Sequence, residues 1–187
     1  MKRILVPIAD GFEEIETTCI VDVLRRAGLS VTLAGVKSGP LKGSRGVYVV
    51  PDSLLSDCLR EEWDMVVLPG GQPGVNNLRQ EASLTAVLKE RHADKNLIAA
   101  ICAAPLILKD ASIIEGLSLT SHPSVEKELG GAVYSCDRVV ISGHIITSRG
   151  PGTAIEFALS LVNILVGKSK ADEISEAVLA LGTYSCQ

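Results

Sequence analysis

The sequence predicts an α/β fold in which a mostly parallel sheet carries helices on both faces. Short, fully apolar runs of strand length alternate along the chain with segments of helical period. Strands that are apolar on both faces are typical of parallel sheets buried beneath helices. The length of 187 residues suits a single domain spanning residues 1–187.

The individual elements follow from apolar runs, periodicity and turn signals. Buried strands are expected at residues 4–8, 31–36, 65–68 and 96–101, with an apolar run at 47–50 and a short strand at 117–120. Residues 138–141 and 144–148, separated by a two-residue turn, predict a hairpin. Helices are expected at residues 13–27, 83–92, 103–109, 153–166 and 168–181. Parallel sheets place their sites at the carboxyl ends of the strands, so the loops after Ile8, Leu68 and Ile101 are the candidate positions.

Composition excludes several classes of partner. Eighteen basic and 22 acidic residues give a net charge of -4, and only 3% of residues are aromatic, so we expect no structural nucleic acid. Five cysteines without a C-x-x-C pair argue against a disulfide framework or a zinc site, and for a reducing, cytoplasmic location. The longest apolar stretch, residues 97–108, is shorter than the ~20 residues that span a bilayer. We therefore expect no membrane partner and no metal.

Cys102 is the candidate nucleophile. It follows the strand at 96–101, and small alanines on both sides permit a sharp strand-to-helix bend of the nucleophile-elbow kind. Pro105 suits the first turn of the helix that follows, and a helix N-terminus favours a thiolate and lowers its pKa. The alternative is that Cys102 is a small buried hydrophobic residue, as most free cysteines are.

Two further strand ends supply candidate partners for Cys102. Gly70 and Gly71 follow the strand at 65–68, and the N–H groups of Gly71 and Ala103 could hold an oxyanion, although a Gly-Gly pair also suits a plain tight turn. Glu16 shares the apolar stripe of its helix, where a carboxylate must be protonated or partnered. A protonated Glu16 bonded to the Cys102 thiolate would form an acid/base pair; a solvated glutamate is the alternative.

The three histidines differ in their surroundings along the chain. His92 lies in a charged stretch and is expected to be solvated, whereas His144 lies in or beside the hairpin turn. His122 follows the short strand at 117–120 and is the one credible imidazole partner for Cys102, although histidines are also common in turns. The segment 148–153 resembles an anion-binding loop but matches neither nucleotide-binding glycine motif.

Taken together, the segments at these strand ends resemble the ThiJ/PfpI superfamily, in the branch of the parkinsonism-associated deglycase. The matching segments are DGFEEIE (10–16), VLRRAG (23–28), VLPGG (67–71), LIAAICAAP (97–105), SHPS (121–124) and TSRGPGT (147–153). The resemblance implies a flavodoxin-like three-layer sandwich, a homodimer, a reactive Cys102, a protonated Glu16 and a nearby His122. Arg45 and Pro151 complete the substrate-contacting positions that we expect.

Some residues depart from patterns seen in relatives. Gly43 and Val50 stand where some relatives carry peripheral cysteines, so a redox role there is lost. Ala103 replaces the histidine that follows the cysteine in protease-like relatives, which argues against peptidase activity. Class I glutamine amidotransferases need a late His-x-Glu pair, but His144 begins His-Ile-Ile.

The resemblance implies one of two functions for Cys102. The first is cofactor-independent detoxification of methylglyoxal or glyoxal, or of their early protein and nucleotide adducts, through a cysteine hemithioacetal. The second is an oxidative-stress sensor or redox-regulated chaperone that responds to oxidation of Cys102. A binding module with an inert cysteine is a third reading.

Overall fold

The computed structural model describes residues 1–180 and contains a central sheet in which seven strands are ordered β10-β11-β7-β6-β1-β2-β5. Its strands are β1 (Arg3–Ile8), β2 (Ser30–Gly35), β5 (Ser53–Leu54), β6 (Met65–Leu68), β7 (Leu97–Ile101), β10 (Val139–Ser142) and β11 (Ile145–Ser148). All neighbours pair in parallel except β10 and β11, which form the expected antiparallel hairpin. Two small sheets pair β3 (Leu41–Lys42) with β4 (Tyr48–Val49) and β8 (Ser118–Leu119) with β9 (Val133–Tyr134).

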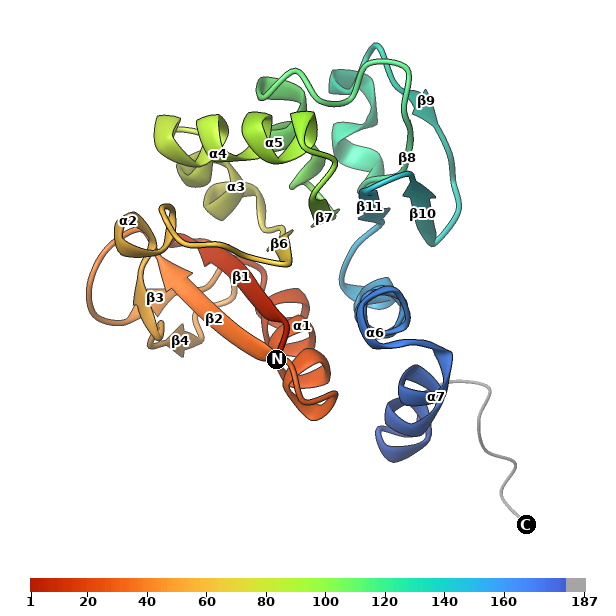
Figure 1. Ribbon diagram of the computed structural model, residues 1–187. Coiled ribbons are helices and arrows are strands. Elements are labelled where there is room, and N and C mark those ends of the chain that lie inside the picture. Colours follow the sequence, from red (N-terminus) through yellow and green to blue (C-terminus); the bar gives the residue numbers. More distant parts are fainter. Residues whose placement is uncertain (181–187) are drawn as a thin grey trace.

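Helices cover both faces of the central sheet (Figure 1). They are α1 (Glu14–Arg26), α2 (Leu55–Cys58), α3 (Gln72–Leu78), α4 (Ala82–Ala93), α5 (Pro105–Asp110), α6 (Ala154–Val166) and α7 (Lys168–Ala177). Helices α1, α6 and α7 contribute to the core on one face, and α2, α3, α4 and α5 to the core on the other. This arrangement is a flavodoxin-like α/β sandwich, which confirms the predicted fold class.

Alternation along the central strands divides the core between the two faces. In β7, Ala99 and Ile101 belong to the core beneath α1 and α6, whereas Ile98 and Ala100 belong to the core beneath α3, α4 and α5. All four side chains are fully buried. Because the side chains on both faces of the strand are buried, its sequence is a continuous apolar run.

Several expected elements differ from those observed. The short strand expected at 117–120 is observed at Ser118–Leu119 and pairs with β9 in a separate sheet. The helix expected from residue 103 begins at Pro105, because the chain first turns sharply at Cys102. The helix expected at 168–181 ends at Ala177, and Leu181 and Cys186 lie outside the described residues. Helices α2 and α3 were not expected, since α2 is one turn long and α3 contains a proline and a glycine.

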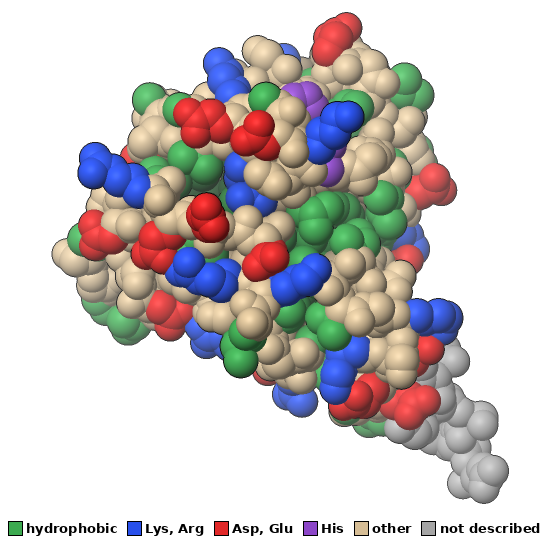
Figure 2. All heavy atoms as spheres, viewed as in Figure 1, with side chains coloured by type: hydrophobic (Ala, Val, Ile, Leu, Met, Phe, Trp, Pro, Cys, Tyr) green, Lys and Arg blue, Asp and Glu red, His purple; other side chains and the backbone are tan. Residues whose placement is uncertain are grey.

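The surface carries interspersed charges of both signs (Figure 2). Basic and acidic side chains alternate over the face in view, without a field of one sign that would attract a polyanion. Within residues 1–180, no helix combines the length and the apolar character needed to cross a membrane.

Candidate active site

The loops after three adjacent strands meet at one edge of the sheet. Strands β7, β6 and β1 are neighbours, and Cys102, Gly70 and Glu16 lie beyond their carboxyl ends. A Cβ built on Gly70 would lie 2.5 Å from the Cβ of Cys102 and 2.6 Å from Oε2 of Glu16. The three residues predicted from separate segments are therefore brought together.

Cys102 sits at a sharp bend of the backbone. Its φ is +65°, in the left-handed region that side-chain-bearing residues seldom adopt. Its N–H donates to the carbonyl of Ser148 at 3.0 Å, and its own carbonyl accepts from the N–H of His122 at 2.8 Å. These two bonds hold a conformation that costs on the order of 1–3 kcal/mol. The predicted elbow is thus present, and it presents a half-buried thiol.

Glu16 projects from the first turn of α1 into the core and is fully buried. Its Oε2 accepts from the N–H of Gly70 at 2.7 Å, whereas Oε1 has no hydrogen-bond partner within residues 1–180. Its backbone N–H donates to the Glu13 carboxylate at 2.7 Å, which caps the helix. A buried carboxyl with an incomplete set of partners favours its neutral form.

Gly70 and Gly71 are required by close contacts. Any side chain at Gly70 would occupy the space between Cys102 and Glu16. Gly71 has a φ of +93°, and a Cβ there would lie 2.4 Å from the carbonyl oxygen of Gly11. The glycine pair therefore does more than close a turn, because it lets β6 approach both side chains of the site.

The Glu16 carboxyl and the Cys102 thiol form a coupled pair. Burial raises the pKa of Glu16 to about 7, against smaller opposite effects of the Gly70 N–H and the Cys102 thiol. Burial raises the pKa of Cys102 to about 12, and the charge of Glu16 adds to this rise. The predicted lowering of the thiol pKa is therefore wrong, because burial is the largest cause and acts whether or not Glu16 is ionised. When Glu16 holds a proton, its contribution to the thiol pKa disappears, so the two groups compete for one negative charge.

Two backbone donors face the sulfur of Cys102. The N–H groups of Gly71 and Ala103 hydrogen-bond to the sulfur and lower the pKa of the thiol, although burial outweighs them. In this structure the two groups bond to the sulfur, and so stabilise a thiolate. Their binding of a substrate oxyanion stays a prediction.

His122 lies beside the pair but is exposed. The hydrogen bonds of its ring, within the described residues, go to Ser124: Nδ1 lies 2.7 Å from Oγ and accepts from the Ser124 N–H at 3.2 Å. A Cβ built on Gly150 would lie 3.5 Å from Cδ2 of His122 and 4.0 Å from Oε1 of Glu16. Gly150 therefore lies between the imidazole and the carboxyl, a role that no glycine motif in the sequence indicated.

Two expected substrate contacts, Arg45 and Pro151, are not among the described residues found in direct contact with Cys102 or Glu16. The side chain of Arg45 is exposed, and its backbone N–H donates to Oε1 of Glu14 at 2.5 Å. Pro151 lines a cavity of about 530 Å³ that α1, α6 and α7 border. Neither side chain has a hydrogen bond or close contact with Cys102 or Glu16 among those found in the described residues.

Glu14 is a structural residue that the sequence reading missed. Glu14 is 8% exposed, and its carboxylate binds the loop between β3 and β4. Its carboxylate accepts from the Ser44 hydroxyl at 3.1 Å and from the Arg45 N–H. A Cβ on Gly43 would lie 2.4 Å from the Glu14 carboxylate, which explains the glycine there. A contact between an acidic residue and a distant glycine carries no signal in a single sequence, and only the fold shows it.

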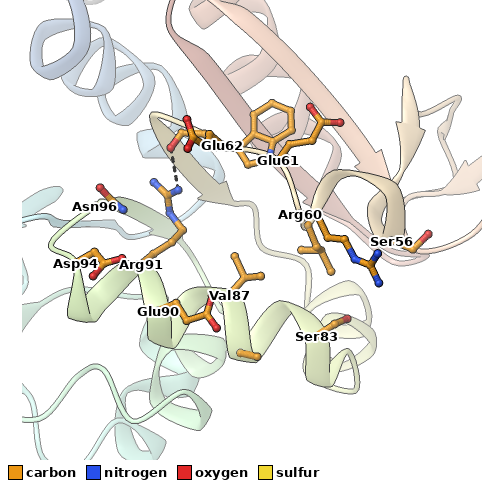
Figure 3. Close-up of a pocket in the computed structure, with 13 residues that line it drawn as sticks. Ser56, Arg60, Glu61, Glu62, Ser83, Val87, Glu90, Arg91, Asp94 and Asn96 are labelled. Atoms are coloured by element: carbon orange, nitrogen blue, oxygen red, sulfur yellow. Dashed lines mark hydrogen bonds between the residues drawn. The ribbon is translucent and has the colours of Figure 1, made fainter.

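A cavity of about 1070 Å³ lies elsewhere, between α4 and the segment that precedes β6 (Figure 3). Arg91 extends from α4 across this cavity toward that segment. Its guanidinium donates to the carbonyls of Trp63 at 2.8 Å and Leu97 at 3.0 Å. The cavity is at the opposite edge of the sheet from Cys102, so it is not part of the candidate active site.

Comparison with known proteins decides the family. The profile of the DJ-1/PfpI family matches residues 2–164. The chain belongs to the DJ-1/PfpI family. Protein dj-1beta of Drosophila melanogaster is 43% identical over 181 residues, covering 95% of this chain and 97% of the relative. A glutathione-independent glyoxalase, DJR-1.2 of Caenorhabditis elegans, is 40% identical and covers 91% of each chain.

Solved structures of the DJ-1/PfpI family share the fold. The crystal structure of Drosophila melanogaster DJ-1beta matches with a TM-score of 0.92 at 44% identity, over 95% of this chain and 97% of that one. The structure of Toxoplasma gondii DJ-1, described as oxidized, matches with a TM-score of 0.93 at 39% identity, over 97% of this chain and 100% of that one. The predicted family is thereby confirmed.

Proposed function

We propose that this protein is a cofactor-independent glyoxalase or deglycase that acts on reactive dicarbonyls through Cys102. The observation that carries the proposal is the buried Glu16–Cys102 pair, in which a thiol on a strained elbow adjoins a carboxyl whose pKa is raised to about 7. A group with a pKa near the working pH can both donate and accept a proton. The glyoxalase relative from Caenorhabditis elegans suggests the substrate class.

The reaction needs no external oxidant or reductant. The Cys102 thiolate adds to the aldehyde carbon of methylglyoxal, and the proton of Glu16 passes to the resulting oxyanion, giving a hemithioacetal. Glu16, now a carboxylate, removes the proton from that carbon, giving an enediolate. Return of this proton to the neighbouring carbon, with transfer of the hydroxyl proton from the first oxygen to the second, gives a lactoyl thioester. Water hydrolyses the thioester to lactate and regenerates the thiol, so one carbon is oxidised as its neighbour is reduced. Glyoxal gives glycolate by the same steps.

The backbone donors and His122 have supporting roles in this scheme. The N–H groups of Gly71 and Ala103 stabilise the thiolate before attack, and Gly71 or Ala103 could then hold the oxyanion once the sulfur is bonded to carbon. His122 lies at the open side of the pair and would assist proton exchange with solvent. Arg45 and Pro151 remain proposed contacts for larger, adduct-bearing substrates.

The test is turnover of methylglyoxal by purified, reduced protein beside Cys102→Ser. We expect wild type to form lactate and the variant to lose at least ~10³-fold in kcat/KM, since a serine hydroxyl has no comparable nucleophilicity at neutral pH. Cys58→Ser is the matched control, because Cys58 is a buried cysteine on α2 away from the site. A negligible rate for wild type, or an active Cys102→Ser, would overturn the proposal.

A second candidate function is sensing of oxidants at Cys102, coupled to chaperone activity. It is favoured by the partial exposure of the thiol and by a relative whose solved structure is described as oxidized. A protonated Glu16 could donate a hydrogen bond to a sulfinate at Cys102. Mass spectrometry after mild peroxide treatment would find added oxygen first at Cys102 if this function holds. Oxidation beginning at exposed Cys136 would contradict it.

We also propose that the protein is a homodimer. Ile15 on α1 is 58% exposed and Ile155 on α6 is 44% exposed, and both line the cavity that Pro151 also borders. A second copy could cover this apolar face. Light scattering should then give about twice 19.7 kDa, and Ile15→Glu should shift it toward the monomer. A single 19.7 kDa species for wild type would contradict the dimer.

A further inference from the structure

We propose that His92 and His144 form a binding site for a divalent transition-metal ion of the Ni²⁺, Cu²⁺ and Zn²⁺ class. His92 lies in the last turn of α4, and His144 lies directly before β11. Both are half-buried. The pair lies at the amino ends of β7 and β11, at the opposite edge of the sheet from Cys102, so this site is independent of the proposed dicarbonyl chemistry.

The two imidazoles have the spacing that one ion requires. Nε2 of His144 lies 3.0 Å from Nδ1 of His92. Metal–nitrogen bonds of about 2.0–2.1 Å that meet at 90–110° place two nitrogens about 2.9 to 3.4 Å apart. The ring centroids are 4.9 Å apart and the rings are tilted by 41°. The geometry therefore brings one ring nitrogen of each residue to coordinating distance, and an ion would replace the proton that the two nitrogens share.

Backbone contacts hold both residues in place before any ion binds. The carbonyl of His144 accepts from the N–H of Ile98 at 3.0 Å, which ties it to β7. The carbonyl of His92 accepts from the N–H of Lys95 at 3.1 Å, within the turn that ends α4. Because the sheet and the helix fix these positions, little conformational entropy is lost when a ligand bridges them.

The charges around the pair limit the affinity of this site. A histidine binds metal through a neutral ring nitrogen, so protons compete with the ion. The ammonium of Lys95 acts on His144 and works against a bound cation.

Water completes the coordination shell in this proposal. Within residues 1–180, no group of three or more His, Cys, Asp or Glu side chains is placed to hold one ion. Two imidazoles with water ligands suit Ni²⁺ or Cu²⁺, which take nitrogen and oxygen donors. We therefore expect an exchangeable site with a Kd on the order of 1 to 100 μM, weaker than a structural zinc centre.

The experiment is a calorimetric titration of the tag-free protein with Ni²⁺ alone at pH 7.5. We expect one equivalent to bind per chain, and His92→Gln and His144→Asn each to weaken binding at least ~10-fold. His122→Asn is the matched control, an exposed histidine at the other edge of the sheet, and should change the Kd by less than ~2-fold. Binding should be lost at pH 5.5, where imidazoles are protonated.

A second measurement needs no variant. Paramagnetic Ni²⁺ should broaden backbone amide signals at the end of α4 and in the β10–β11 turn before it affects others. Absence of binding by wild type, binding unchanged in both His92→Gln and His144→Asn, or broadening centred on Cys102 and His122 would each overturn the proposal. Since the Cys102→Ser variant retains both histidines, it should bind Ni²⁺ like wild type whether or not the dicarbonyl proposal holds.

Discussion

The two edges of the central sheet each contain a buried ionisable group, but only one of these groups can lose its proton near neutral pH. At the amino edge, Arg91 is 8% exposed; its guanidinium donates to two backbone carbonyls, and its Nε has no hydrogen-bond partner within residues 1–180. At the carboxyl edge, Glu16 is fully buried and has one backbone donor, while Oε1 has no partner within the described residues. Arg91 stays charged because its proton cannot leave at physiological pH, whereas Glu16 can release or regain a proton.

This difference separates a structural charge from a chemical one. The carbonyls around Arg91 fix a permanent cation and tie α4 to β6 and β7. The donors around Glu16 are too few to fix an anion, so its proton is shared with the neighbouring thiol. An unpartnered buried atom is costly at either edge, but it serves proton transfer only at Glu16, whose proton can leave near neutral pH.

The largest expected effect is that of Glu16→Gln on turnover. Glutamine keeps the shape and a hydrogen-bond donor, but it cannot pass on a proton. We expect kcat for methylglyoxal to fall by at least ~10²-fold. The rate of Cys102 alkylation at pH 7.5 should fall much less, or rise, because a neutral neighbour no longer raises the pKa of the thiol. Wild-type turnover in Glu16→Gln would assign the acid/base role to His122 or solvent.

A substitution of Arg91 at the amino edge should lower stability and leave turnover nearly unchanged. Arg91→Met fills the volume but leaves the carbonyls of Trp63 and Leu97 without their donors. We expect a loss of about 2 to 3 kcal/mol in the free energy of unfolding, measured by urea denaturation. Turnover per folded molecule should stay within ~2-fold of wild type. A large loss of turnover without a loss of stability would mean that the two edges are coupled.

Glu16 also makes stability depend on pH. Its carboxyl pKa is raised from 4.5 to about 7 in the folded state, so the folded chain holds a proton that the unfolded chain releases between these values. Stability from this group is therefore full below pH 4.5 and is lost as pH rises through about 7. The shift in the Glu16 pKa allows a change in unfolding free energy of at most roughly 3 kcal/mol. We expect a change of about 1 to 2 kcal/mol, because water can enter beside an ionised carboxylate.

The measurement is the difference in unfolding free energy between Glu16→Gln and wild type at several pH values. Glutamine does not titrate, so the unfolding free energy of the variant should rise relative to that of wild type between pH 5 and pH 8. Cys58→Ser serves as a control for general pH effects. A difference that stays constant over this range would show that Glu16 is not protonated in the folded state.

Most of the fold could be predicted from the sequence, because the buried parallel strands read as apolar runs of the right length. The positions of Cys102, Gly70 and Glu16 could be predicted as well, since each follows a strand whose carboxyl end had to lie at one edge. The short strand at 117–120 was predicted, but its pairing with β9 was not, because a two-residue ladder carries no signal of its partner. The predicted direction of the shift in the Cys102 pKa was wrong, because the sequence shows the helix end that stabilises a thiolate but not the extent of burial.

The smallest expected effect is that of His122→Asn on turnover. Asparagine is a good helix-capping residue, so it can replace Nδ1 of His122 as the acceptor for the Ser124 N–H. The backbone N–H at this position also keeps its bond to the Cys102 carbonyl, so the elbow is preserved. Only the imidazole is lost, and it is exposed and has its ring hydrogen bonds with Ser124 rather than with the Glu16–Cys102 pair.

We therefore expect kcat for methylglyoxal to fall by less than ~10-fold, with no change in the pH midpoint set by Glu16. The comparison to make is the full pH–rate profile of His122→Asn against those of wild type and Glu16→Gln. A fall of ~10²-fold or more, accompanied by loss of one limb of the profile, would make the imidazole a principal acid/base. Proton transfer at the carboxyl edge would then pass through the exposed imidazole. The unpartnered Oε1 of buried Glu16 would lower stability without serving the chemistry.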